Sequence, residues 1–464
     1  MPILIILFAL GLLMTAAYRG VSVIVFAPIA ALLAIVLTDP ALTLPLFSGV
    51  FMERMVGFIK LYFPVFLLGS IFGKLMEITG FARSIISSVL RFTGPEHSII
   101  AVVLVCAVLT YGGVSLFVVA FAVYPFGAEL FRASDTPKRL LPATIALGAF
   151  TFTMDALPGT PQIQNVIPTT FFGTNSWAAP KLGLMGAAFL LTSGIAWLEW
   201  RRRHARAAGE GYGLNQTNEP VSSGNQGLCN PFLAAAPLVI VPVLNLLFTG
   251  WFPVWYAPSF SFSQYGVQSV APLDTSKLTA IWAVECALTV AVCSVLVWWF
   301  ANRRAGLRPA LNAAVSGAML ATLNTGSEYG FGAVVAALPG FEQVSRAVAA
   351  SVHSPLVNVA VTTNVLAGIT GSASGGLSIA LAAMSETFLR NAANAGIPAE
   401  VLHRVAAMAS GGMDTLPHNG AVITLLAITG LTHQASYADI FALTILKTLA
   451  VFFVIGLYLT SGLI

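Results

Sequence analysis

The chain has 464 residues, of which 57% are hydrophobic and only 9% are charged, and its mean hydropathy is +0.86. Soluble domains carry about 25% charged residues, so this composition excludes a soluble globular protein and indicates an all-α polytopic membrane protein. The formal net charge of +4 is placed mainly in short connections, which is typical of membrane topology and not of nucleic-acid binding.

Apolar runs that are long enough to cross a bilayer recur along the whole chain. In chain order they are Ile3–Tyr18, Val21–Leu37, Phe58–Met76, Ile99–Thr110, Val114–Phe131, Leu182–Trp200, Phe232–Phe248, Leu278–Phe300 and Ile440–Leu459. We expect about ten to twelve membrane-crossing elements, some of them interrupted. The first run lacks a basic start and a small-residue cleavage site, so we expect a retained helix and not a cleaved signal.

One polar stretch, residues 201–228, divides the chain near its middle and has the composition of a linker. It predicts an N-terminal transmembrane repeat over 1–200 and a C-terminal one over 229–464. Four arginines, Arg201, Arg202, Arg203 and Arg206, follow one span, whereas residues 251–276 contain no Lys or Arg. The positive-inside rule therefore places 201–228 and 302–308 in the cytoplasm and 251–276 outside.

The two halves share motifs in the same order. "MDALPGTPQIQN" at 154–165 and "MDTLPHNGAVIT" at 413–424 both carry Asp-x-Leu-Pro, at an offset of 414 − 155 = 259. Phe72-Gly73 matches Phe331-Gly332 at the same offset, and "GGVSL" at 112–116 matches "GGLSI" at 375–379 at an offset of 263. Internal duplication of this kind predicts two inverted repeats with broken helices that meet at a binding site near the midplane.

Asp155 and Asp414 lie inside otherwise apolar segments, where a carboxylate is usually paired, solvated or protonated. Two interpretations stay open for them. Each can cap the helix that follows the Leu-Pro pair, or each can bind a proton or organise the site.

The residues after each Pro differ between the halves, so we expect them to determine specificity. The first break offers Gly159, Thr160, Gln162, Gln164 and Asn165, and the second offers His418 and Asn419. Amide and hydroxyl groups beside exposed helix N-termini suit a carboxylate that bears hydroxyl or keto groups. His418 is either a titrating partner or a neutral scaffold residue.

Three tracts are rich in Ser, Thr and Gly. They are Gly112, Gly113 and Ser115 in the first half, Thr325, Ser327 and Glu328 within "NTGSEYGFG", and Ser372, Ser374, Gly375, Gly376 and Ser378 within and after "TGSASGG". Such tracts let the backbone approach a ligand closely, although small residues also serve helix packing in membranes. Glu328 favours a binding role for the second tract, because a carboxylate has no packing reason to be there.

Signals of other classes are missing from the sequence. It contains no His-Glu-x-x-His, no phosphate-binding loop and no Gly-x-Ser-x-Gly elbow, so neither an ATP-driven pump nor a familiar hydrolase is supported. We predict that the chain is not an enzyme and uses no metal or cofactor. An anion channel is a further alternative, although two diverged half-sites are not typical of a ring-forming filter.

Over most of its length the chain resembles the gluconate permease family of the wider ion-transporter superfamily. The residues that carry the likeness are "LGSIFGKLMEITGFARSII" at 68–86, "TYGGVSLFVVAFAVYP" at 110–125, "GSASGGLSIAL" at 371–381 and "ASGGMDTLPHNG" at 409–420. The resemblance implies inverted repeats with re-entrant hairpins, a homodimer and proton-coupled uptake of small sugar acids or hydroxy acids. The forms of the two breaks are similar to a branch associated with short monocarboxylates such as 3-hydroxybutyrate, or with citrate.

The sequence therefore predicts a proton symporter of the bacterial inner membrane that imports a small organic anion. We expect Asp155, Asp414, Glu328 or His418 to carry the proton and the polar residues named above to bind the substrate. The alternative is a sodium-coupled carrier of dicarboxylates or tricarboxylates, with the cation at Asn324-Thr325 and Thr362-Thr363-Asn364.

Overall fold

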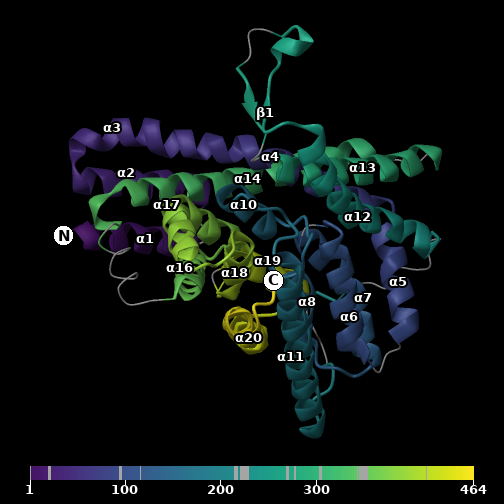
Figure 1. Cartoon of the computed structure of the whole chain (residues 1–464). Helices are drawn as coiled ribbons and strands as arrows, with labels where there is room; N and C mark the ends of the chain where they lie inside the picture. The colour runs from purple at the N-terminus through teal and green to yellow at the C-terminus, as the bar shows by residue number, and fades with distance from the viewer. Residues whose placement is uncertain are drawn as a thin grey trace.

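Helices form almost the whole of the computed structural model, as the composition predicts (Figure 1). The structure describes all residues except 1, 19–21, 94–96, 115, 214–217, 220–228, 268–270, 276–277, 303–305, 342, 344–353, 414 and 418. Within the described ranges, the one sheet is an antiparallel pair, β1 (Ser259–Phe260) and β2 (Leu273–Asp274), in which Ser259 pairs with Asp274. The prediction of an all-α polytopic fold is confirmed.

The described residues of the first half form eleven α-helices with short connections. They are α1 (Pro2–Tyr18), α2 (Val23–Thr38), α3 (Thr43–Leu46), α4 (Glu53–Ile78), α5 (Phe81–Thr93), α6 (Ser98–Tyr111), α7 (Leu116–Ala133), α8 (Leu141–Ala149), α9 (Phe152–Asp155), α10 (Ile163–Phe172) and α11 (Pro180–Ala207). A π-helical segment, η2 (Phe47–Met52), joins α3 to α4, and two 3-10 turns, η1 (Pro40–Leu42) and η4 (Lys138–Leu140), precede α3 and α8.

The helices of the second half follow the same order. They are α12 (Pro231–Trp255), α13 (Thr279–Ala301), α14 (Leu307–Ala337), α16 (Pro355–Thr370), α17 (Ala373–Asn394), α18 (Ala399–Gly412), α19 (Gly420–Thr429) and α20 (His433–Ser461), with a 3-10 turn η5 (Ser263–Tyr265) between β1 and β2. Both α10 and α19 have ten residues and end at a left-handed glycine, Gly173 and Gly430, with a constant offset of 420 − 163 = 257. These two helices therefore match in length and in their glycine ends, and the duplication of the whole halves stays a prediction.

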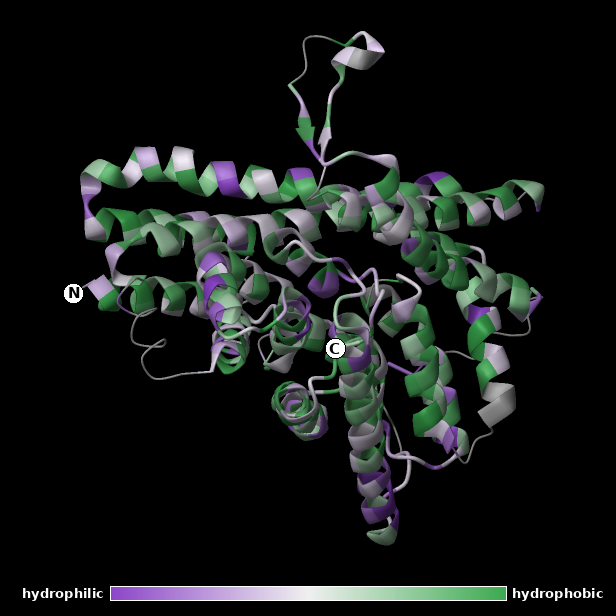
Figure 2. Ribbon diagram, in the orientation of Figure 1, coloured by the Kyte–Doolittle hydropathy of each residue, from purple (hydrophilic) through white to green (hydrophobic). Residues whose placement is uncertain are grey.

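Five helical segments of the described chain are long and apolar enough to cross a membrane. They are Pro40–Ile78, Pro180–Ala207, Pro231–Trp255, Thr279–Ala301 and His433–Ser461. Five shorter apolar helices accompany them: Pro2–Leu13, Val23–Thr38, Ser98–Tyr111, Pro355–Gly368 and Gly420–Thr429. Hydrophobic residues run along α2, α12 and α13, whereas hydrophilic residues gather at the C-terminal end of α11 (Figure 2).

Helices of the two halves pack against each other at several places. The long helices α4 and α14 pack against each other, and each also packs on a helix of the opposite half, α13 and α2 respectively. The equivalent residues Phe72 on α4 and Phe331 on α14 are both fully buried. Beneath this layer, α10 of the first half contacts α17 and α18, and α19 of the second half contacts α7 and α8. Residues of both halves therefore belong to one hydrophobic core.

Figure 1 places the β1–β2 hairpin and the C-terminal end of α11 at opposite ends of the molecule. The placement of residues 251–276 outside and of residues 201–228 in the cytoplasm stays a prediction from the charge pattern. Aromatic side chains cluster at the base of the hairpin, where Tyr256 contacts both Phe260 and Trp282. Aromatic residues of this kind favour the membrane–water interface.

Candidate functional site

Two helix breaks lie at equivalent places in the halves. The first break separates α9, which ends at Asp155, from α10, which begins at Ile163, and the second separates α18 from α19. Asp155 ends its helix and the N-cap of α10 is Gln162, so the interpretation of Asp155 as a cap is wrong. The N-cap of α19 is Asn419, whose side chain accepts hydrogen bonds from Ala421 and Val422. Asp414 and His418 lie outside the described residues.

The pairs α6–α7 and α16–α17 each form a helical hairpin with a tight tip. The C-cap of α6 is Gly112 and the C-cap of α16 is Gly371, again 259 residues apart. The structural match of Gly112-Gly113 is therefore Gly371-Ser372, and the sequence match to Gly375-Gly376 is shifted by four residues. Gly375 and Gly376 instead lie in the first turn of α17, where a Cβ on Gly376 would overlap the backbone of Ala367 on α16. Ser115 is outside the described residues.

An amide side chain ties each break to the hairpin tip of the same half. Gln162 donates from Nε2 to the carbonyl oxygen of Thr110 over 2.7 Å, and Asn419 donates from Nδ2 to the carbonyl oxygen of Gly371 over 2.7 Å. Gln162 and Asn419 occupy the same N-cap position in α10 and α19. The four segments that the duplication repeats therefore meet in two equivalent pairs.

The first break is held by internal hydrogen bonds. Thr160 donates to the carbonyl of Thr153 over 2.8 Å, and Asn165 donates to the carbonyls of Thr160 and Ser176 over 3.0 and 2.8 Å. Both side chains are fully buried. Because their donor groups bond backbone carbonyls, these two side chains hold the backbone of the break in place and their donors are not free to bind a ligand.

Arg404 on α18 was not among the residues predicted from the sequence, although it is fully buried against the first break. Its guanidinium donates to the carbonyl of Asp155 over 2.9 Å, to Asn165 Oδ1 over 3.0 Å and to the carbonyl of Ala178 over 2.8 Å. The Asp155 carboxylate also acts on it electrostatically. The signal that could have found Arg404 is a lone cation inside the apolar run 401–412.

The carboxylate of Asp155 reaches the second break. A Cβ on Gly411 would overlap Asp155 Oδ2, and a Cβ on Gly412 would overlap the amide of Asn364. Only glycine fits at these two positions because the polar groups lie directly against the backbone. Asp155 thus connects the break of its own half with that of the other half.

A second polar cluster surrounds Glu328 on α14, which is 3% exposed. Its carboxylate lies against Gly375, where a Cβ would overlap Oε2, and it interacts with Ser372. Ser374 lies 3.5 Å from Ser372 and 3.4 Å from Thr325. Ser327 points elsewhere, toward Met55 on α4. The predicted residues Thr325, Glu328, Ser372, Ser374 and Gly375 are therefore brought together, and Ser327 is not.

Several buried polar atoms near these clusters have no hydrogen-bond partner among the described residues. Beside the first break and hairpin they are Thr110 Oγ1, Gln164 Oε1 and Trp177 Nε1. On α14, α16 and α17 they are Asn324 Oδ1, Glu328 Oε2, Thr363 Oγ1, Asn364 Oδ1 and Ser378 Oγ. Unpartnered buried polar atoms are rare in folded proteins, so they mark where a ligand, an ion or water is expected.

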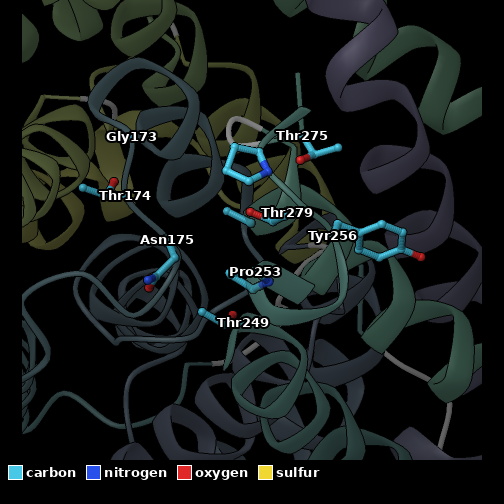
Figure 3. Close-up of a pocket in the computed structure, with 10 residues that line it drawn as sticks. Gly173, Thr174, Asn175, Thr249, Pro253, Tyr256, Thr275 and Thr279 are labelled. Carbon is cyan, nitrogen blue, oxygen red and sulfur yellow. The ribbon is translucent and has the colours of Figure 1, made fainter. Parts of the chain in front are cut away.

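The first break also lies near a pocket. Its volume is about 280 Å³, and it is formed where α10 and α12 end and α13 begins (Figure 3). No cluster of three or more His, Cys, Asp or Glu side chains with metal-site geometry occurs in the described part of the chain.

Broken helices that meet hairpin tips in two related halves of a helical membrane protein define the class of membrane transporters. The chain is 56% identical over 472 aligned residues, covering 100% of both sequences, to the "Uncharacterized transporter YxjC" of Bacillus subtilis (strain 168). It belongs to the same transporter family as that protein. No family model matches the chain.

The crystal structure of the YdaH transporter of Alcanivorax borkumensis is similar to the fold described here. The TM-score is 0.53 with 14% sequence identity, and the match covers 89% of this chain and 88% of the other. This likeness supports the fold alone. The predicted membership of the gluconate permease family stays a prediction.

Proposed function

We propose that the chain is a secondary active transporter of the bacterial inner membrane that imports a small organic acid anion with protons by alternating access. The observation that carries this proposal is the pair of equivalent ties, Gln162 to Thr110 and Asn419 to Gly371. Broken helices expose N–H and C=O groups that hydrocarbon does not tolerate, but that a polar ligand between them satisfies. Because each half contributes one break bonded to one hairpin tip, a ligand between the halves can be bound by backbone groups from both of them.

The chemistry of the unpartnered atoms supports a small hydroxylated acid. The groups beside the first break are hydroxyl, amide and indole, and Arg404 already donates to Asp155, Asn165 and Ala178. A tricarboxylate requires cations that these groups do not supply. The proposed substrate is therefore a short hydroxy monocarboxylate such as 3-hydroxybutyrate, or a gluconate-like sugar acid.

Glu328 is the best-supported proton carrier among the four candidates. It is buried, its carboxylate bonds the Ser372 side chain, and one of its oxygens has no hydrogen-bond partner in the described structure. Asp155 instead interacts electrostatically with the Arg404 guanidinium, so we propose that it positions that residue and does not carry the proton. Asp414 and His418 remain candidates from the sequence.

Sodium coupling is the second candidate, and one observation favours it. Thr325, Ser372 and Ser374 bring three hydroxyl oxygens close to the Glu328 carboxylate. Oxygen ligands of this type suit a hard cation. In both cases, we propose that the halves 1–200 and 229–464 are joined by a cytoplasmic linker at 201–228 and that the protein is a homodimer.

The test is uptake of radiolabelled 3-hydroxybutyrate, gluconate and citrate into proteoliposomes with an imposed pH or sodium gradient. We expect the wild type to accumulate a hydroxy acid when only the pH gradient is present. Glu328→Gln is expected to lose accumulation while it still exchanges labelled for unlabelled acid. Glu386→Gln, an exposed carboxylate on α17, is the matched control and is expected to behave as wild type.

The alternatives give distinct results. Accumulation that requires a sodium gradient favours the second candidate, and full pH-driven accumulation by Glu328→Gln removes Glu328 as the carrier. Linear flux without accumulation indicates a channel. If none of the three acids is taken up, the proposed substrate class is wrong.

A further inference from the structure

The pocket beside α10 is lined only by uncharged residues. They are Gly173, Thr174, Asn175, Thr249, Pro253, Tyr256, Pro258, Thr275, Thr279 and Ala280. Figure 3 shows Thr174, Asn175, Thr249 and Thr279 around the space, while the Tyr256 hydroxyl points away from them. A pocket with hydroxyl and amide groups but no cation holds an anion weakly, because a tight anion site needs charge or several free N–H donors.

Two hydrogen-bonded routes lead from this pocket to the first break. On one route, Thr249 Oγ1 donates to the carbonyl of Asn245, and Asn245 Nδ2 donates to the carbonyl of Gly159 over 3.0 Å. On the other, Thr174 Oγ1 lies 2.7 Å from His403 Nδ1, and His403 Nε2 lies 3.2 Å from Asn165 Oδ1.

Both routes end at residues of the break, Gly159 and Asn165. Because the routes start from Thr249 and Thr174, which line the pocket, the inner end of the pocket adjoins the first break.

Trp177 contacts both Asn175, which lines the pocket, and Gly159 of the break. Its backbone N–H donates to Asn175 Oδ1 over 2.8 Å, and Asn175 lines the pocket. Its ring fills the space over Gly159, where a Cβ would overlap the indole. Its Nε1–H is buried without a hydrogen-bond partner among the described residues. An indole N–H can only donate, so the group that satisfies it must be an acceptor, such as a carboxylate or hydroxyl oxygen.

We propose that this pocket is the outer access site for the transported acid and that Trp177 is a substrate-binding residue at its inner end, donating Nε1–H to a substrate oxygen. The inference rests on the proposed function, which supplies the substrate class. The connection between α12 and α13, which borders the pocket, is the segment that the charge pattern places outside. A weakly binding entrance lets the acid pass on to the unpartnered donor and does not retain it in the pocket.

The first test separates binding from turnover. Trp177→Phe keeps an aromatic side chain but removes the N–H together with the part of the indole that lies over Gly159. We expect the KM for uptake of the accepted hydroxy acid to rise about tenfold, with the maximal rate unchanged, because one hydrogen bond to a charged oxygen is lost. Trp200→Phe, an exposed indole at the end of α11, is the control and is expected to keep the wild-type KM. An unchanged KM in Trp177→Phe overturns the binding role.

The second test asks whether the pocket opens outward. In a variant that lacks Cys106, Cys229, Cys286 and Cys293, Asn175→Cys is treated in whole cells with a membrane-impermeant maleimide, and Arg203→Cys in the predicted cytoplasmic linker is the control. We expect labelling of Asn175→Cys alone, inhibition of uptake by the label, and slower labelling when the accepted acid is present. No labelling, or labelling without effect on uptake, overturns the access site.

The two proposals fail in different ways. If wild-type protein takes up none of the acids, the proposed function is wrong, and labelling of Asn175→Cys still reports whether the pocket faces outward. If uptake is normal but Asn175→Cys is not labelled, only the access site is wrong.

Discussion

The Asn419 side chain caps a helix and also bonds a hairpin tip, and the contribution of each role to stability can be measured separately. Its Oδ1 caps α19 by accepting from Ala421 over 2.7 Å and from Val422 over 3.2 Å, and its Nδ2 ties the break to Gly371. Losing an N-cap costs about 1 kcal/mol, and leaving a buried carbonyl without its donor costs about 1–3 kcal/mol. Asn419→Ala is therefore expected to lower the free energy of unfolding by about 2–4 kcal/mol.

Two further variants separate the terms. Asn419→Ser keeps an oxygen that can cap the helix but is too short to reach Gly371, so only the tie is lost, at about 1–3 kcal/mol. Gln162→Ala loses the tie to Thr110 within the first half and no cap bond. Because the Thr110 carbonyl still accepts from the Gly113 N–H over 3.0 Å, a smaller loss of about 0.5–1.5 kcal/mol is expected. Asn302→Ala, whose amide bonds Trp298 at an exposed position, is the control and is expected to change stability by less than about 0.5 kcal/mol.

The measurement is unfolding of the purified full chain in mixed detergent micelles, with the free energy taken from the transition. The reasoning is refuted if Asn419→Ser and Gln162→Ala are both as stable as wild type, because the ties then contribute nothing. It is also refuted if Asn302→Ala loses as much as Asn419→Ala, since the effect is then not specific to the break.

Three other predictions follow from contacts described above. Gly375→Ala places a Cβ over the Glu328 carboxylate and is expected to abolish pH-driven uptake. The control is Gly420→Ala, where no atom lies within 4 Å of the added Cβ, and it should keep wild-type uptake. Equal uptake by the two variants would contradict the close approach of Gly375 to Glu328. Phe72 and Phe331 are equivalent and fully buried. Replacing either one by Ala should lower the free energy of unfolding by about 3–5 kcal/mol. A difference above about 2 kcal/mol between the two variants would show that the two sites are not equivalent. The hydrogen bond from Arg139 holds the pKa of Glu210 below its usual value. The contact therefore stabilises the linker above about pH 4.3, and this stabilisation is lost as the pH falls through the lowered pKa. Hydrogen-exchange protection of residues 208–213 should drop at low pH in wild type, and Arg139→Ala should show low protection already at pH 7.

Much of the architecture could be predicted from the sequence because its signals are local. Apolar length gave the helices, and the Asp-x-Leu-Pro repeats gave both breaks, since proline and glycine interrupt a helix wherever they stand. The register of the hairpins was missed, because Gly375-Gly376 matches Gly112-Gly113 in letters while the chain turns at Gly371. The residue at which the hairpin turns depends on how α16 packs on α17, and a short sequence motif does not predict that packing.

The candidate site was predicted only in part for the same reason. Asn165 and Thr160 were expected to bind a ligand, but the structure uses them to hold the first break. Arg404 and Trp177 act on that break from other segments, and Arg404 is 249 positions from Asp155 along the chain. Contacts of this range are set by the tertiary fold, so residue type and spacing do not reveal them.

The bonds that Arg404 donates across the halves have a consequence for synthesis. The carbonyls of Asp155 and Ala178 belong to the first half, but the guanidinium that they bond is translated only after α11, the linker and helices α12, α13, α14, α16 and α17. Until then, the first break must enter the bilayer without these bonds. Chains that stop before Arg404 lack these bonds, so their first half is expected to be less stable in the membrane than it is in the full chain.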